Sequence, residues 1–158
     1  MPKITPFLWY DKEAEEAAKF YCSVFKNSKI HRTARYPEGS PAPTGSVMTV
    51  EFELEGQRFI ALNAGPHFKF NEAVSFVIDC DTQAEVDNYW SKLTSDGGQE
   101  SMCGWLKDKY GLSWQVTPKA LGKLMTDPDK EKAKRVMQAM MQMKKINIAE
   151  LEEAYAAV

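Results

Sequence analysis

The chain contains 158 residues, of which 44% are hydrophobic and 27% are charged, and its net charge is −2 at pH 7. This length and composition are typical of one globular domain and exclude a disordered chain. The weakly acidic balance argues against nucleic acid or an anionic membrane as the main partner, and no apolar run approaches the roughly 20 residues that span a bilayer.

The first predicted unit begins with a strand-like run around Ile4 to Leu8. An amphipathic helix is expected next, because apolar residues recur at helical spacing from Ala14 to Phe25, with Asp11 as the expected N-cap. Three strands are predicted to follow the helix, over residues 29–36, 47–54 and 58–62.

The same order of elements returns 70 residues later. Identical residues recur at this offset, namely Asp11, Ala14 and Glu15 in the first copy and Asp81, Ala84 and Glu85 in the second. Thr82 and Glu85 form a capping box that predicts the second helix start, and Gly97-Gly98 predicts its end. Strands are expected near Gln99 and over residues 103–107 and 113–117. The sequence therefore predicts a duplicated β-α-β-β-β unit.

The remaining residues are predicted to be helical. After Asp127-Pro128 one apolar face is expected from Ala133, Val136, Met137, Met140 and Met141, and another from Ile148, Leu151 and Tyr155. Because this tail is amphipathic, it must cover either its own sheet or a second subunit. The predicted division is residues 1–65 for the first unit, 66–120 for the second unit and 121–158 for the tail.

Several segments resemble one protein family. They include ITPFLWYD at residues 4–11, CGWLKD at residues 103–108 and YGLSWQV at residues 110–116. In these segments the chain resembles the PhnB-like, or 3-demethylubiquinone-9 3-methyltransferase domain, family of the vicinal-oxygen-chelate superfamily, which includes glyoxalases, bleomycin-resistance proteins and dioxygenases. The resemblance implies an α+β fold in which two tandem βαβββ units form curved mixed sheets around a cavity, with C-terminal helices added.

The superfamily's metal site is expected to be missing. Its usual ligands are a His on the first strand of each unit and a carboxylate on the last strand of each. On this chain the first-strand positions fall on Thr5 and Ser75, and the last-strand positions on Gln115 and near Ile60 or Ala61. Hydroxyls and amides are weak ligands for Zn, Ni or Fe, so we expect no metal and no cofactor.

The resemblance also locates candidate ligand-binding residues. Strand parity places Phe7 and Trp9 on the face of Thr5, and Asn63 and Trp105 are assigned to the cavity wall by analogy. The complete predicted set is Thr5, Phe7, Trp9, Asn63, Ser75, Trp105 and Gln115. Aromatic rings with a few amides and hydroxyls suit a planar or partly apolar small molecule held by hydrogen bonds. Ordinary core packing is the alternative for each aromatic residue.

Other functional patterns give weaker predictions. His31 is expected to be exposed or structural, whereas His67 lies in a loop where an acid/base group would fit. The residues Glu51, Glu53 and Glu55 form a period-two row, which indicates a solvated strand face or paired carboxylates in a cleft. No glycine-rich nucleotide turn and no nucleophile motif is present, so the methyltransferase label finds no support in the residues.

Two features bear on location. The cysteines Cys22, Cys80 and Cys103 are odd in number and widely spaced, which suits a reducing compartment, and each is expected to be a small buried apolar residue. Residues 1–5 lack the apolar stretch of a secretory signal. We therefore expect a cytoplasmic protein.

Three functions are consistent with these patterns. The first is a metal-independent small-molecule-binding protein that forms a homodimer. The second is an isomerase, lyase or dioxygenase with a metal in a rearranged site, for example through His67 and a glutamate. The third is a dimeric structural module whose tail swaps onto a partner.

Overall fold

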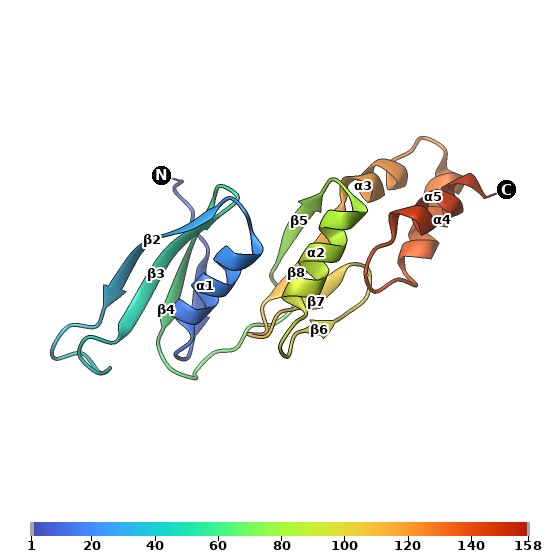
Figure 1. Ribbon diagram of the computed structural model, residues 1–158. Coiled ribbons are helices and arrows are strands. Elements are labelled where there is room, and N and C mark those ends of the chain that lie inside the picture. The colour runs from blue at the N-terminus through green and yellow to red at the C-terminus, as the bar shows by residue number, and fades with distance from the viewer. Residues whose placement is uncertain (1, 158) are drawn as a thin grey trace. The chain divides into compact units, whose positions relative to one another are not determined.

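The fold is described by a computed structural model that covers residues 2–157. The chain divides into two compact units, Met1–Phe70 and Asn71–Val158 (Figure 1). The first unit contains β1 (Phe7–Tyr10), α1 (Ala14–Val24), β2 (Ser28–Arg35), β3 (Val47–Leu54) and β4 (Gln57–Asn63). The second contains β5 (Ser75–Cys80), α2 (Gln83–Leu93), β6 (Gln99–Glu100), β7 (Trp105–Lys107), β8 (Ser113–Pro118), α3 (Lys119–Met125), α4 (Lys130–Met140) and α5 (Ile148–Ala156). The finer three-part division of the sequence stays a prediction.

Both units share one strand topology. The strand orders are β1-β4-β3-β2 and β5-β8-β7-β6. In each sheet the first and last strands of the unit pair in parallel, and all other neighbours are antiparallel. These are two mixed four-stranded sheets, so the predicted α+β fold of tandem βαβββ units is confirmed.

The strand registers confirm the internal repeat. Phe7 pairs with Ile60, and 70 residues further on Val77 pairs with Gln115. The exposed fractions agree, at 56% for Phe7 and 58% for Val77, and the residue that follows each of them is buried. Each parallel strand therefore has a buried face and an open face, at equivalent positions in the two units.

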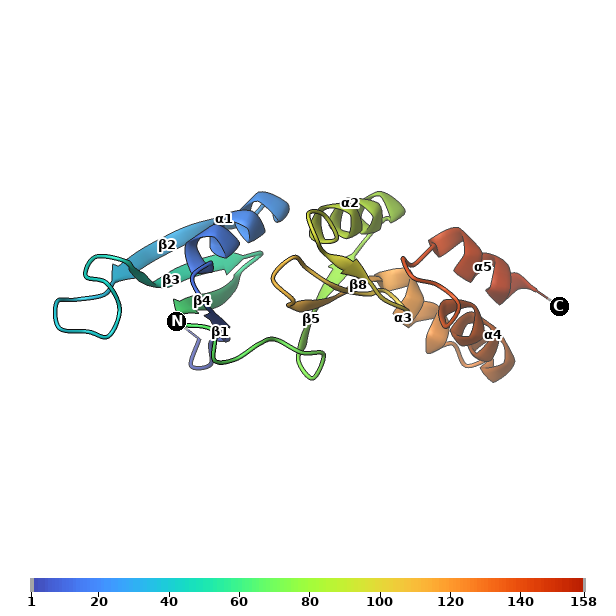
Figure 2. The same cartoon turned by 90° about the horizontal axis from the view of Figure 1, so that it is seen from below.

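Helix α1 covers one face of the first sheet because its small and apolar residues repeat at helical spacing (Figure 2). Its buried residues are Ala14, Ala17, Ala18, Tyr21 and Val24. In the core beneath the helix, the Tyr21 ring stacks on Phe52 at a centroid distance of 6.1 Å, and Phe52 stacks on Phe59 at 5.4 Å. Small residues on the helix thus bring an aromatic layer of the sheet close to its axis.

The predicted N-cap of α1 is wrong. The helix begins at Ala14, its N-cap residue is Glu13, and no side chain of the cap itself makes the capping bond. Instead, the Ala14 N–H donates to Oδ1 of Asn63 at 2.8 Å. An amide from the end of β4 therefore supplies the acceptor that was assigned to Asp11, because free N–H groups of a first helical turn need a partner from some source.

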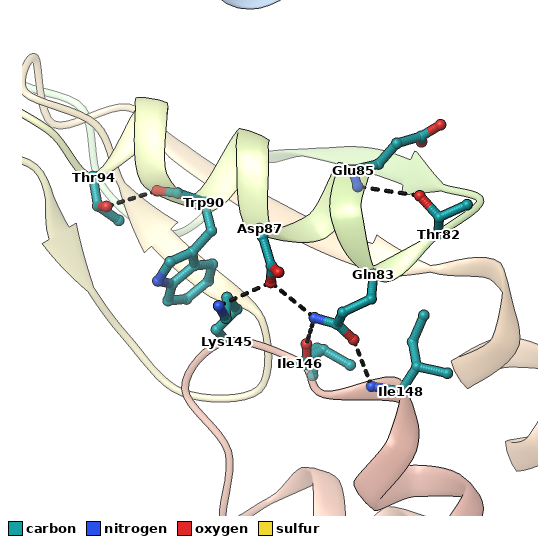
Figure 3. Close-up of polar contacts among 9 residues, drawn as sticks. All are labelled: Thr82, Gln83, Glu85, Asp87, Trp90, Thr94, Lys145, Ile146 and Ile148. Carbon is teal, nitrogen blue, oxygen red and sulfur yellow. Dashed lines mark hydrogen bonds and ion pairs between the residues drawn. The ribbon is translucent and has the colours of Figure 1, made fainter.

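Helix α2 begins as predicted, but it ends at Leu93, before the predicted stop at Gly97-Gly98. The Glu85 N–H donates to the Thr82 hydroxyl at 3.2 Å (Figure 3). The Glu85 carboxylate accepts from the Asp81 N–H at 3.0 Å. The helix ends at Leu93, and the turn after it contains Gly97 at a φ of 105°. A Cβ on Gly98 would lie 2.6 Å from the Leu93 carbonyl oxygen, so only glycine fits there.

The tail packs within the second unit. Helices α3, α4 and α5 lie together (Figure 2). Between them is a small apolar cluster of Leu121, Val136, Met143, Ile146 and Leu151. The predicted apolar face of α4 is only partly right, because Met137 and Met141 are 45% and 55% exposed. The helix ends at Met140, and the following turn brings Met143 into the cluster in their place. The apolar faces of the tail helices thus pack against one another within this chain.

Two further expectations concern cysteines and membranes. All three cysteines are free, with Cys80 buried and Cys22 and Cys103 half-buried, so the buried setting is confirmed fully only for Cys80. Over residues 2–157, no helix combines the length and the apolar character needed to cross a membrane.

Candidate functional site

The seven predicted ligand residues fall into two groups. Ser75, Trp105 and Gln115 lie on the second sheet or at its edge. Thr5, Phe7, Trp9 and Asn63 belong to the first unit. In the first group the side chains of Ser75 and Gln115 bind each other, whereas in the second group Asn63 and Trp9 bind backbone groups.

A row of four polar residues crosses the open face of the second sheet. In register order across β5, β8, β7 and β6 they are Ser75, Ser113, Lys107 and Gln99. Side chains of directly paired residues project to the same face, with Cβ atoms about 4.5–5.5 Å apart. The row therefore brings two hydroxyls, an ammonium and an amide together on the face opposite to the buried residues Ile78 and Val116.

Gln115 and Trp105 form the next row on this face. The two residues are direct partners in the β7–β8 pair. The Gln115 side-chain amide donates to the Ser75 hydroxyl at 2.9 Å, which links the two rows. Two of the predicted ligand residues thus bind each other, and Trp105 lies beside them.

A pocket of about 200 Å³ opens beside these rows. Its lining residues are Glu72, Gln99, Glu100, Ser101, Trp105, Leu106, Lys107 and Ser113. Ser113 is only 1% exposed, and among the described residues its hydroxyl has no hydrogen-bond partner. Because buried polar atoms are nearly always paired, the missing partner of this hydroxyl calls for an explanation. We call this cavity the Ser113 pocket.

Lys107 and Glu72 form an ion pair at the Ser113 pocket. The Lys107 side chain is 34% exposed, whereas that of Glu72 is 62% exposed. The hydrogen bond from Lys107 is the main cause that holds the pKa of the Glu72 carboxyl below its usual value. The Glu72 carboxylate therefore pairs with the Lys107 ammonium from the more exposed side.

The polar atoms of the first unit serve the fold. The Asn63 side-chain amide donates to the Val47 carbonyl at 3.2 Å, in addition to capping α1, and the Asn63 carbonyl accepts a bond from the Tyr36 hydroxyl. Asn63 was predicted to line the cavity wall. Its bonds instead connect the end of β4 to β3, to the start of α1 and to the loop after β2. Thr5 is half-buried and Phe7 is exposed, so both are accessible on the open face.

Trp9 packs on the loop after β4. Its indole N–H donates to the Gly65 carbonyl at 2.8 Å, and its ring meets Phe68 edge-on at a centroid distance of 4.8 Å. His67 lies against the same indole at 6.4 Å. The loop that the sequence singled out for His67 is therefore an aromatic cluster around Trp9.

The glutamate row of the first unit is paired with cations. One carboxylate oxygen of Glu53 lies 3.1 Å from Nε2 of His31 and 3.5 Å from Nε of Arg58. Glu51 pairs with Arg32 at 3.4 Å. The alternative of paired carboxylates is wrong, because each of these two carboxylates faces a basic group on a neighbouring strand.

The residues at the inherited metal positions do not fit a metal ion. Ile60 pairs with Phe7 as Gln115 pairs with Val77, so an isoleucine holds one of the last-strand positions. At two of the others, the Ser75 hydroxyl and the Gln115 amide bind each other, and Thr5 offers only a hydroxyl. Within residues 2–157, no three His, Cys, Asp or Glu side chains gather closely enough to hold an ion.

Of the eight residues that line the Ser113 pocket, sequence reasoning had named Trp105 alone as a ligand residue. Ser113 and Lys107 could have been found, because strand parity places them on the faces of Gln115 and Trp105. Glu72 lies in the turn before β5, where no periodicity indicates the direction of a side chain. Only the folded chain brings it to Lys107.

Comparisons with known proteins agree with this geometry. The family model for 3-demethylubiquinone-9 3-methyltransferase matches residues 2–117. A PhnB protein structure from Bacillus cereus is 38% identical, with a TM-score of 0.68, and the match covers 74% of this chain and 99% of that one.

More distant structures share the fold alone. A protein from Pseudomonas aeruginosa is 19% identical, with a TM-score of 0.62, and the match covers 75% of this chain and 98% of the other. The fosfomycin resistance protein FosX from Listeria monocytogenes is 11% identical, with a TM-score of 0.52 and coverage of 75% and 93%. No curated protein matches the chain significantly. The resemblance stated from the sequence is confirmed by the family model and these structures.

Proposed function

Because this chain belongs to the 3-demethylubiquinone-9 3-methyltransferase family, a branch of the vicinal-oxygen-chelate superfamily, we propose that it binds a small molecule without the help of a metal ion. The binding site proposed is the Ser113 pocket together with Ser75 and Gln115. Thr5, Phe7, Trp9 and Asn63 remain proposed ligand residues of the first unit. The methyltransferase reaction in the family's description is not part of the proposal.

One observation carries this proposal, the unpaired hydroxyl of Ser113. A buried hydroxyl without a partner costs about 1–3 kcal/mol. A ligand oxygen in the Ser113 pocket would remove this cost when it accepts a hydrogen bond from Ser113. The pocket is large enough for a small group, since its volume is about 200 Å³.

The chemistry of the lining residues defines a ligand class. The Lys107 ammonium and the Ser113 hydroxyl are donors, so they favour a ligand group rich in acceptor oxygens. Trp105 offers a flat apolar surface beside them. We therefore propose a compact planar molecule that carries a carboxylate or a similar oxygen group.

Titration calorimetry with benzoate, 4-hydroxybenzoate and phenylphosphonate tests the proposal. We expect at least one of these probes to bind. Ser113→Ala should weaken binding about tenfold, the size of one lost charge-assisted hydrogen bond, and Trp105→Ala should weaken it because the flat apolar surface is lost. Ser91→Ala, at an exposed position of α2, is the matched control and should bind as the natural chain does. Failure of all three probes to bind the natural chain would overturn the ligand class, and equal binding by the Ser113 variant would overturn the site.

We also propose that the protein is a cytoplasmic homodimer. The exposed side chains of Phe7 and Val77 support a second copy as the cover of these open faces, because large apolar side chains are stabilised by removal from water. The three free cysteines support a reducing compartment. Sedimentation equilibrium of the natural chain and of Phe7→Glu tests the dimer, and a monomer at all concentrations in the natural chain would contradict it.

A further inference from the structure

The segment between α4 and α5 lies beyond the residues matched by the family model, which end at residue 117. We call residues 143–148 the strap. Two successive carbonyls of the strap accept hydrogen bonds from the loop before β7. The Cys103 N–H donates to the Met143 carbonyl at 2.7 Å, and the Gly104 N–H donates to the Lys144 carbonyl at 2.8 Å. The strap is therefore bonded to the loop by its backbone.

Helix α2 holds the other side of the strap (Figure 3). The Gln83 amide nitrogen donates to the Ile146 carbonyl at 3.0 Å, and the Gln83 amide oxygen accepts from the Ile148 N–H at 2.7 Å. Lys145 also pairs with Asp87 on the same helix at 2.8 Å. The Gln83 side chain thus binds the carbonyl of Ile146, just before α5, and the N–H of Ile148, the first residue of α5. These two bonds fix the strap on α2.

The loop that the strap holds leads directly to the Ser113 pocket. Gly104 has a φ of 83°, and a Cβ there would lie 3.0 Å from the Ile146 side chain, which is fully buried. The Gly104 carbonyl accepts from the Val116 N–H at 2.8 Å, and Trp105 is the next residue in the chain. Strap, loop and pocket wall form one continuous set of bonded and packed groups.

We propose that the strap is a positioning element for the Ser113 pocket, and that Gln83 is the positioning residue that holds it. When the strap is docked, the loop at residues 101–104 keeps Trp105 and Ser101 in place as walls of the pocket. Ligand binding and strap docking are then coupled, and the coupling acts equally in both directions. The part of this inference that concerns ligands rests on the proposed function.

Hydrogen–deuterium exchange of the full chain tests the structural part without any ligand. In Gln83→Leu, which keeps the bulk of the side chain but removes both strap bonds, we expect faster exchange of the Cys103, Gly104 and Val116 amides as well as of the strap. Asn88→Leu, at an exposed position of the same helix, is the control and should leave these amides protected. Faster exchange confined to the strap and α5 would overturn the inference.

A second variant covers the case in which Gln83→Leu fails to fold. Ile148→Pro removes the N–H that Gln83 binds and replaces a half-buried isoleucine side chain, and proline is well tolerated at the first position of a helix. The residue before it, Asn147, is extended, with φ −115° and ψ 109°, which suits a following proline. The same loss of protection in the loop is expected, and unchanged protection would count against coupling.

Titration with the aromatic carboxylate probes tests the part that concerns ligands. We expect Gln83→Leu to weaken probe binding about fivefold or more, the usual lower range for coupled sites, and Asn88→Leu to leave it unchanged. In the reciprocal experiment the probe should slow exchange of the strap amides of the natural chain. Equal probe affinity in both variants would overturn the coupling, whereas a probe that binds neither variant nor the natural chain would overturn the proposed function and leave the exchange result standing.

Discussion

Ser113 and Ser75 make a matched pair for a test of the Ser113 pocket. They are direct partners across β5 and β8, and the same substitution to alanine removes one hydroxyl from each. The Ser75 hydroxyl accepts from Gln115 at 2.9 Å, whereas that of Ser113 is buried without a partner in the described chain. The two substitutions should therefore change stability in opposite directions.

The magnitudes follow from the cost of an unpaired group. Ser113→Ala removes a buried unpaired hydroxyl, so the free energy of unfolding should rise by about 1–3 kcal/mol. Ser75→Ala removes a bonded acceptor and leaves the Gln115 amide without this partner, so the free energy should fall by about 1 kcal/mol. For a chain of this length, each 1 kcal/mol corresponds to about 2–4 °C in Tm.

Urea unfolding followed by circular dichroism measures both changes, and thermal unfolding checks their sign. Ligand binding should respond differently, because the Ser113 variant is the more stable protein and yet the weaker binder of the carboxylate probes. A loss of stability in Ser113→Ala as large as that in Ser75→Ala would refute the reasoning, since it would show that the Ser113 hydroxyl is already bonded in the free protein.

Two further predictions concern the loop glycine and the buried thiol. Gly104→Ala should destabilise the chain more than Gly111→Ala in urea unfolding, because both residues have positive φ but only at Gly104 would the new Cβ meet a neighbour, the Val116 carbonyl oxygen at 2.9 Å. Cys80 should react more slowly than Cys22 with iodoacetamide at pH 8, because burial raises the pKa of both thiols but raises that of Cys80 to about 12. Labelling of the two thiols at equal rates in peptide mass spectrometry would contradict this.

Local patterns predicted the repeated units well, because the forces that set them are local or periodic. The match of Thr5 with Ser75 located the equivalent strands, and the capping residues Thr82 and Glu85 located the start of α2. Asn63 shows where such reasoning ends. It was placed in a cavity wall by analogy, yet its amide caps a helix that begins 49 residues earlier, and no sequence spacing encodes that contact.

The strap could not be predicted from the sequence for a related reason. Its bonds to Cys103 and Gly104 join backbone groups, which every residue possesses, so they leave no mark on residue type. The amphipathic pattern of the tail indicated that it covers something. Only the fold shows that the strap residue Ile146 packs against Gly104, beside the pocket wall.

The repeat itself indicates which unit needs a ligand. By register, Glu53 is the equivalent of Lys107, and Arg58 is the equivalent of Ser113. In the first unit these two positions bind each other, and His31 completes the set, so the row is satisfied by the chain itself.

In the second unit the same positions hold a cation and a hydroxyl, and the Ser113 hydroxyl accepts no hydrogen bond from Lys107 in the described chain, although a hydroxyl is able to accept one. Glu72 reaches only the Lys107 ammonium, from an exposed turn, and the Ser113 hydroxyl stays unpaired. In the first row a carboxylate thus lies between two basic groups, whereas the second row keeps an unpaired hydroxyl that a ligand oxygen would complete.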